Sequence, residues 1–111
     1  MIGHTGNLNA AIEAIEEVDR GIGELWALTQ EKKGRLIITA DHGNCETMVD
    51  PETGEPHTAH TTNPVPFIVA DPAQRYSQLK NGALCDVAPT ILKLMQIAAP
   101  PQMTGVPLLK E

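Results

Sequence analysis

The longest regular pattern in the chain lies near its amino end, where apolar side chains recur at steps of three and four residues. The positions in this pattern are Leu8, Ala11, Ile12, Ile15, Val18, Ile22, Leu25 and Trp26. Such spacing places the apolar side chains on one face of a helix, so it predicts a helix over Leu8–Thr29. Asn7 is a candidate N-cap, and the segment Lys32-Lys33-Gly34 is typical of a helix end.

Two short apolar runs, from Arg35 to Ala40 and from Val65 to Ala70, are typical of buried strands. A second apolar stripe predicts a helix over Val87–Gln96, with Asp86 as its N-cap and Pro89 in the tolerated first turn. A helix, a tight loop and an apolar strand make half of a parallel α/β unit. We therefore predict an α/β fold, with a mainly parallel sheet flanked by the two helices.

Composition sets the class of protein. The chain has 111 residues, enough for one domain, and its 41% apolar and 20% charged residues are typical of a globular protein. A net charge of −6 argues against a nucleic acid or a membrane surface as partner. We find no secretory signal and no run long enough to span a membrane. Cys45 and Cys85 are expected to be free thiols in a reducing cytoplasm, although a disulfide between them stays open.

The segment Thr39-Ala40-Asp41-His42-Gly43-Asn44 carries the clearest chemistry, because it follows the first predicted strand. In open α/β sheets, ligands bind at the carboxyl ends of the strands. A carboxylate and an imidazole side by side suit a borderline divalent metal such as manganese or zinc, and Gly43 lets the backbone turn away. The alternative for this dipeptide is an Asx-type turn with a surface histidine.

All four histidines, His4, His42, His57 and His60, lie in loops next to the predicted elements. His4 precedes the first helix, His42 follows the first strand, and the other two precede the second strand. If the two strands are parallel neighbours, these positions do not automatically share one end of the sheet. A metal site therefore requires the His57–His60 loop to fold back over the end that bears Asp41, and spacing alone leaves this open.

Other chemistries match the sequence less well. The cysteines lack zinc-ribbon spacing, and there is no phosphate-binding glycine-rich loop with a lysine. Ser77 is the only serine, with no base beside it, so it is expected on the solvated surface. Cys45 lies three residues after His42, and a buried structural thiol is favoured there over a cysteine–histidine nucleophile.

Three segments in order, Gly3–Asn7, Thr39–Asn44 and His57–Pro66, resemble the carboxyl-terminal part of the cofactor-independent (2,3-bisphosphoglycerate-independent) phosphoglycerate mutases. These enzymes belong to the alkaline phosphatase superfamily. The resemblance covers essentially the whole chain, including Asp86–Thr90 and the tail around Gly105. It implies that residues 1–111 are the carboxyl-terminal part of a metal-binding, alkaline-phosphatase-like domain.

The resemblance also implies an activity and a set of ligands. Enzymes of this family interconvert 3-phosphoglycerate and 2-phosphoglycerate by phosphoryl transfer through a serine. They use two divalent ions, with manganese expected here and zinc, cobalt or magnesium possible, and no organic cofactor. By the match, Asp41 and His42 bind the metal on the serine side, and His4 and His60 bind the other. His60 begins the family's His-Thr-x-x-x-Val-Pro frame, which leaves His57 as a neighbour of the ligands.

The chain also departs from this family. Family members are several times longer, and their nucleophilic serine, an amino-terminal aspartate and an inserted substrate-binding domain lie upstream of the matching part. A further aspartate ligand stands immediately before the position of Met1. The resemblance therefore implies a fragment that has no catalytic residue of its own and is inactive when isolated.

Three alternatives stay open at this point. The chain could be a non-catalytic metal-binding or interaction fragment, or it could complement a separate amino-terminal half. It could also belong to another phosphotransferase of the superfamily such as phosphopentomutase, which Gly3–Asn7 disfavours. A partial sheet exposes an apolar edge, so we expect self-association or a need for the missing half.

Overall fold

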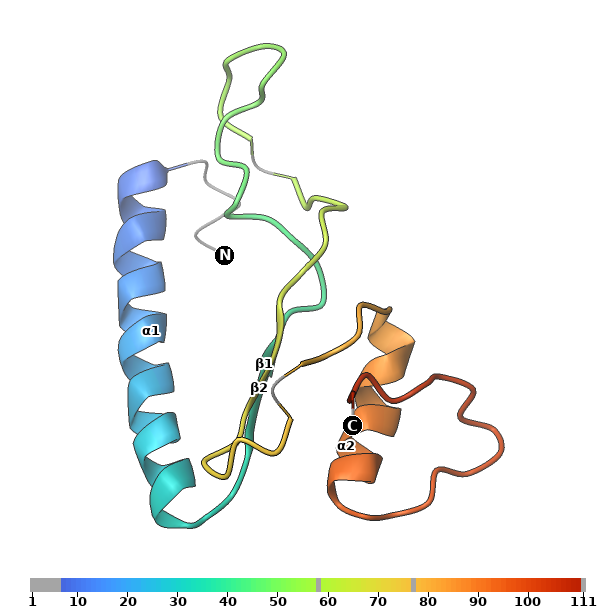
Figure 1. Ribbon diagram of the computed structural model, residues 1–111. Helices are drawn as coiled ribbons and strands as arrows, with labels where there is room; N and C mark the ends of the chain where they lie inside the picture. Colours follow the sequence, from blue (N-terminus) through green and yellow to red (C-terminus); the bar gives the residue numbers. More distant parts are fainter. Residues whose placement is uncertain (1–6, 58, 77, 111) are drawn as a thin grey trace. The chain divides into compact units, whose positions relative to one another are not determined.

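The computed structural model describes residues 7–57, 59–76 and 78–110. They fold as two compact units, Met1–Pro72 and Ala73–Glu111. The first contains a long helix and a strand pair, and the second contains a short helix preceded by one 3₁₀ turn (Figure 1). In chain order the elements are α1 (Leu8–Glu31), β1 (Leu36–Thr39), β2 (Phe67–Ala70), η2 (Leu84–Asp86) and α2 (Val87–Leu94).

Helix α1 begins where the sequence predicted it. The Asn7 side-chain oxygen accepts a hydrogen bond from the backbone N–H of Ala10 at 3.0 Å, which satisfies one of the first-turn donors. The helix ends two residues later than predicted, at Glu31, and Lys33 rather than Gly34 takes the left-handed conformation with φ of 57°. The N–H of Gly34 then bonds to the carbonyl of Thr29 at 2.9 Å and closes the helix end.

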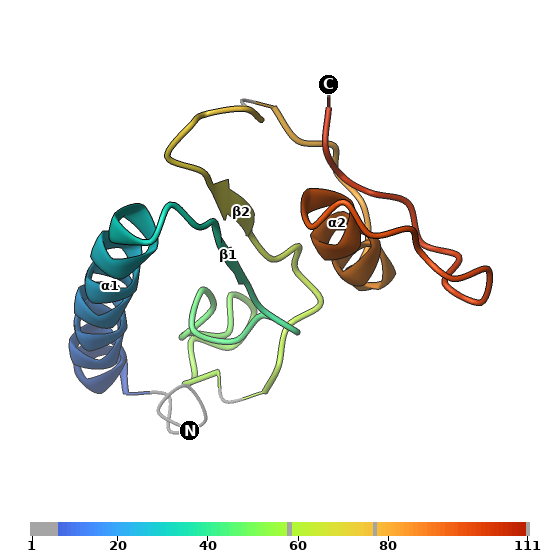
Figure 2. The same cartoon turned by 90° about the horizontal axis from the view of Figure 1, so that it is seen from below.

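The chain turns after α1 and runs back beside the helix as β1 (Figures 1 and 2). Most of the apolar face of α1 stays in solvent, and Ala11 is its buried member. Six larger side chains on the helix are between 46% and 61% exposed, namely Leu8, Ile12, Ile15, Val18, Leu25 and Leu28. The described residues therefore leave this face without a packing partner over most of its length.

Strands β1 and β2 pair in antiparallel fashion, with Leu36 opposite Ala70 and Thr39 opposite Phe67. The predicted mainly parallel sheet is therefore not confirmed, because the one strand ladder in the described residues is antiparallel. The connection explains this result. Residues 40–66 contain turns and isolated bridges, whereas a parallel pair needs a crossover, usually a helix, to return the chain to the same end.

Both strands are shorter than predicted, and their ends are fixed by specific contacts. Pro66 lies just before β2 and its carbonyl accepts a hydrogen bond from the Thr39 hydroxyl at 2.8 Å. At the other end of the ladder, Arg35 Nε lies 3.3 Å from Asp71 Oδ2, and the Asp71 side chain is only 6% exposed. The loop over 50–56 is a loose hairpin, with Val49 bridged to Pro56.

The second unit is organised around α2 and the tail that follows it. The helix ends at Leu94, two residues before the predicted end, and Gln96 takes a positive φ of 60°. Leu94 is buried, as are Leu108 and Leu109 of the tail. Leu109 bridges to Leu79, which ties the tail to the segment before the helix.

Asp86 occupies the N-cap position of α2, as predicted, but its side chain makes no capping hydrogen bond to that helix. Its carboxylate instead accepts hydrogen bonds from the backbone N–H groups of Ala83 and Val106, both at 2.8 Å. These donors hold the pKa of Asp86 below its ordinary value of 3.8, with the Ala83 N–H as the largest cause. The side chain thus joins the turn before the helix to the tail.

Cys45 and Cys85 are both free thiols, as expected. Among the described residues, no helix has the length and apolar character needed to cross a membrane.

Candidate metal centre

The antiparallel pairing decides where the predicted site residues meet. Asp41 and His42 come directly after β1, and the segment with His57 and His60 comes before β2. Because Thr39 pairs with Phe67, the end of β1 and the start of β2 lie at the same end of the ladder. The return of the second loop to the Asp41 end, which the sequence left open, therefore follows from the strand orientation.

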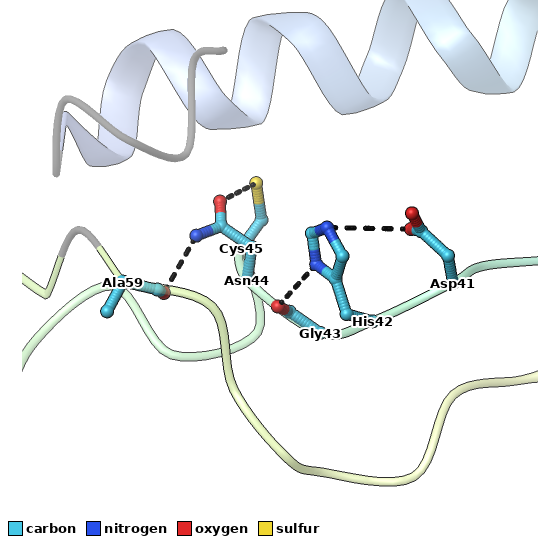
Figure 3. Close-up of polar contacts among 6 residues, drawn as sticks. All are labelled: Asp41, His42, Gly43, Asn44, Cys45 and Ala59. Atoms are coloured by element: carbon cyan, nitrogen blue, oxygen red, sulfur yellow. Dashed lines mark hydrogen bonds and ion pairs between the residues drawn. The ribbon is translucent and has the colours of Figure 1, made fainter.

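Hydrogen bonds hold the two loops together. The N–H of Thr61 bonds to the carbonyl of Gly43 at 2.9 Å, in an isolated antiparallel bridge. The Asn44 side-chain amide donates to the carbonyl of Ala59 at 2.9 Å (Figure 3). These bonds connect residues that are fifteen to eighteen positions apart in sequence.

The rings of His42 and His60 are stacked. Their centroids lie 3.7 Å apart and their planes are inclined by 17°. Two of the predicted ligands are therefore in direct contact at one rim of the strand pair. Two imidazole side chains therefore occupy neighbouring positions at this rim.

Asp41 and His42 offer donor atoms to the same side of the rim. His42 Nε2 lies 3.6 Å from Asp41 Oδ1, and His42 Nδ1 lies 3.1 Å from the carbonyl oxygen of Gly43 (Figure 3). In the tautomer that donates a hydrogen bond from Nδ1 to this carbonyl, Nε2 carries no proton. Its lone pair is then free to bind a metal ion on the side where Asp41 lies. The His42 side chain is 39% exposed and the Asp41 side chain is 86% exposed, so both are accessible from solvent.

These donors fit a divalent ion in type and spacing. Zinc, for example, lies about 2.0–2.2 Å from imidazole nitrogen and carboxylate oxygen, so two donor atoms 3.6 Å apart can contact one ion. Within the described part of the chain, however, no group of three histidine, cysteine or acidic side chains could hold a metal ion by itself. The described residues therefore supply only part of a metal site.

The remaining residues that the sequence singled out are His57, His4 and Ser77. His57 is not part of the ring stack; its backbone N–H bonds to the carbonyl of Met48 at 2.8 Å. Its Nε2 is buried and has no hydrogen-bond partner among the described residues. His4 and Ser77 lie outside the described residues, so their predicted roles remain predictions.

Sequence reasoning missed Glu46, which links the two loops. Its carboxylate accepts a hydrogen bond from the Thr61 hydroxyl at 2.8 Å and from the Asn63 side-chain amide at 3.4 Å. The Thr61 hydroxyl is the largest cause that lowers the pKa of Glu46. Nothing in the sequence pattern distinguishes this glutamate from other acidic residues in polar loops.

Comparison with known proteins agrees with this chemistry. Residues 1–99 match the family model described as the Metalloenzyme superfamily. A 2,3-bisphosphoglycerate-independent phosphoglycerate mutase of Cereibacter sphaeroides is 59% identical over 106 residues, which cover 95% of this chain and 21% of the relative. The proteins of the same name from Agrobacterium fabrum and Rhodopirellula baltica are each 55% identical, over 98% and 99% of this chain.

The comparisons confirm the resemblance that the three sequence segments indicated. The chain spans about one fifth of the length of the curated relatives that it matches. Since the superfamily model covers residues 1–99, the chain belongs to the Metalloenzyme superfamily and has an alkaline-phosphatase-like domain.

Proposed function

We propose that the chain is the carboxyl-terminal, metal-binding part of a 2,3-bisphosphoglycerate-independent phosphoglycerate mutase, an isomerase that interconverts 3-phosphoglycerate and 2-phosphoglycerate. The observation that carries the proposal is the rim beyond β1, where the stacked rings of His42 and His60 lie beside the Asp41 carboxylate. Relatives with this name match nearly the whole chain. The donor chemistry and the relatives thus support the same function.

In this proposal, Asp41 and His42 hold one divalent ion, and His4 and His60 hold the second. Manganese is the expected metal, and zinc, cobalt and magnesium are alternatives. When bound, two such ions clamp phosphoryl oxygens and activate a hydroxyl for in-line transfer. Imidazole nitrogen and carboxylate oxygen are donor types that suit borderline divalent ions.

The chain's own residues orient these donors. The Gly43 carbonyl, 3.1 Å from His42 Nδ1, selects the tautomer in which Nε2 can bind a metal. Asp41 places an exposed carboxylate 3.6 Å from that nitrogen. By the family resemblance His57 is a neighbour of the ligands, and its Nε2 is buried without a hydrogen-bond partner among the described residues. A hydrogen-bond partner for this nitrogen would remove a desolvation cost of about 1–3 kcal/mol.

The proposed activity needs groups that this chain does not supply. By the family resemblance, the nucleophilic serine and further aspartate ligands lie upstream of the matching part. Each ion then has two protein ligands from this chain, fewer than the three or four that a well-formed site provides. The chain alone is therefore inactive and binds metal weakly, and it needs the rest of the mutase. A glycolytic mutase works in the cytoplasm, a compartment that suits two free thiols.

The test combines a mutase assay with a manganese titration of the purified 111-residue chain. We expect no turnover of 3-phosphoglycerate and micromolar or weaker affinity by calorimetry. Replacing His42 or His60 by alanine should weaken binding further, whereas Glu52→Ala should not, since the described residues offer the Glu52 side chain no polar partner and it lies outside the rim. Turnover by a sample shown by mass spectrometry to lack a full-length enzyme would contradict the proposal, as would nanomolar affinity.

A further inference from the structure

Glu46 lies at the point where the two histidine-bearing loops touch. Its Oε2 accepts the Thr61 hydroxyl at 2.8 Å and the Asn63 amide at 3.4 Å. The Asn63 amide also reaches the Thr47 hydroxyl at 3.5 Å. One carboxylate therefore binds two of the three polar side chains that directly follow His60, those of Thr61 and Asn63.

The backbone beneath this carboxylate is shaped to admit it. Gly43 is buried, and a Cβ placed there would overlap both Thr61 Oγ1 and Glu46 Oε2. The carbonyl of Gly43 accepts the Thr61 N–H at 2.9 Å, so the two backbones are already in contact. The close approach requires a residue without a side chain, and it allows the Glu46–Thr61 bond to form over the bridge.

The position of this bond bears directly on the ring stack. His42 precedes Gly43 and His60 precedes Thr61, so each ring is attached to a residue next to the bridged pair. The stacked imidazoles and the Asn44–Ala59 bond also join the loops. The Glu46 contact differs from these because a charged acceptor makes hydrogen bonds roughly twice as strong as neutral ones.

We propose that Glu46 is a positioning residue, whose carboxylate holds Thr61 and Asn63 against the turn after β1 and so fixes the His60 ring against the His42 ring. Glu46 itself contacts no metal in this account. The inference deepens the proposed function, on which its significance for metal binding rests. The positioning itself concerns the metal-free chain and is measurable there.

The first experiment measures the ring contact by NMR on the isotope-labelled, metal-free chain. Wild type should show a nuclear Overhauser effect between ring protons of His42 and His60. Glu46→Ala should lose it, while Glu46→Gln, which keeps an acceptor oxygen, should retain it. Glu52→Ala removes the same charge outside the contact and should also retain the signal. A full-strength ring contact in Glu46→Ala would overturn the inference.

Two further variants test the same bond from its other sides. Thr61→Val removes the donated hydroxyl and keeps the side-chain shape, and Gly43→Ala fills the space in which the bond forms. Both should lose the ring contact while the far-UV circular dichroism keeps its helical signal. If Glu46→Ala does not fold, Thr61→Val tests the inference in its place. A ring contact retained in Thr61→Val would refute the role of the Glu46–Thr61 hydrogen bond.

A manganese titration then separates this inference from the proposed function. Glu46→Ala should bind Mn²⁺ at least about ten-fold more weakly than wild type, as is typical for residues that orient metal ligands. Glu46→Gln should restore most of the affinity. If wild type binds no manganese although the ring contact depends on Glu46, the metal proposal fails and the positioning role stands. Equal manganese affinity in wild type and Glu46→Ala would refute the inferred role in metal binding.

Discussion

At the scale of single residues, the most informative buried polar group is Thr90, which has no exposed surface. Its hydroxyl donates to the Asp86 carbonyl at 2.7 Å and accepts the N–H of Leu108 at 2.9 Å. The first bond lies within the helix start, and the second reaches the tail eighteen residues later. A single hydroxyl thus connects α2 to the carboxyl-terminal segment.

Thr90→Val should loosen the tail, because the N–H of Leu108 is left buried without an acceptor. An unsatisfied buried donor costs about 1–3 kcal/mol. Amide hydrogen exchange at Leu108, followed by NMR, should therefore be faster in the variant. Thr90→Ser keeps the hydroxyl and serves as the control. Wild-type protection of Leu108 in Thr90→Val would show that the bond does not hold the tail.

Asp86 should make the tail contact sensitive to acid. The N–H groups of Ala83 and Val106 lower its pKa in the folded chain, so folding favours the charged form. This contribution to stability is complete above the ordinary value of 3.8 and is lost as the pH falls through the lowered pKa. The Val106 amide signal should shift in that acidic window. Asp86→Asn should remove the shift, and a midpoint above 3.8 would contradict the account.

The sequence identified the donors of the candidate site better than the residues that hold them. Asp41, His42 and His60 were predicted from their residue types and the family resemblance, and the structure brings them to one rim. Glu46 and the tail contacts of Asp86 were not predicted. Their partners lie fifteen to twenty residues away, and such pairings depend on the path of the loops rather than on any local pattern.

At the scale of elements, helix α1 was predicted well because its apolar period extends over many turns. Its interior contains two glycines, Gly21 and Gly23, and a Cβ at either position would meet nothing within 4 Å. Alanine there should stabilise the helix by about 0.5–1 kcal/mol per site. Thermal unfolding followed by circular dichroism measures the gain.

Gly105→Ala is the matched comparison, because its Cβ would overlap the backbone carbonyl of Cys85. This substitution should destabilise the chain. Destabilisation by alanine at Gly21 or Gly23 would contradict the exposed position of this part of α1 in the structure.

Strand orientation was the least predictable element-level feature. The apolar runs at Leu36–Thr39 and Phe67–Ala70 have the same appearance in parallel and antiparallel pairs. Orientation is decided by the connection, and the described residues of 40–66 form no crossover helix. The same connection carries the site residues, so the unconfirmed parallel orientation and the open question about the metal site had one cause.

At the scale of the whole molecule, the apolar face of α1 is the main feature without a partner in the described residues. Ile15 and Val18 are 54% and 61% exposed near its middle. The chain spans about one fifth of the length of the relatives that it matches. In the isolated chain, this apolar face can be buried by packing against a second copy of the same chain.

We therefore expect the isolated chain to self-associate, as measured by light scattering coupled to size-exclusion chromatography. The double substitution Ile15→Glu and Val18→Glu should shift it toward the monomer, because it places charge on the apolar face. Asn9→Glu with Ala27→Glu adds the same charge to exposed positions away from that face and should leave the association unchanged. A monodisperse wild-type monomer would contradict the expectation.

The central claim is that Asp41, His42 and His60 share one rim and supply donors to two divalent ions, Asp41 and His42 to one ion and His60 to the other. The most direct test adds substoichiometric Mn²⁺ to the labelled chain and follows paramagnetic broadening by NMR. The claim predicts that the ring signals of His42 and His60 and the Asp41 signals broaden first, before those of exposed acidic residues such as Glu13 and Glu52. Broadening that spares both rings, or that spreads evenly over the exposed carboxylates, would contradict it.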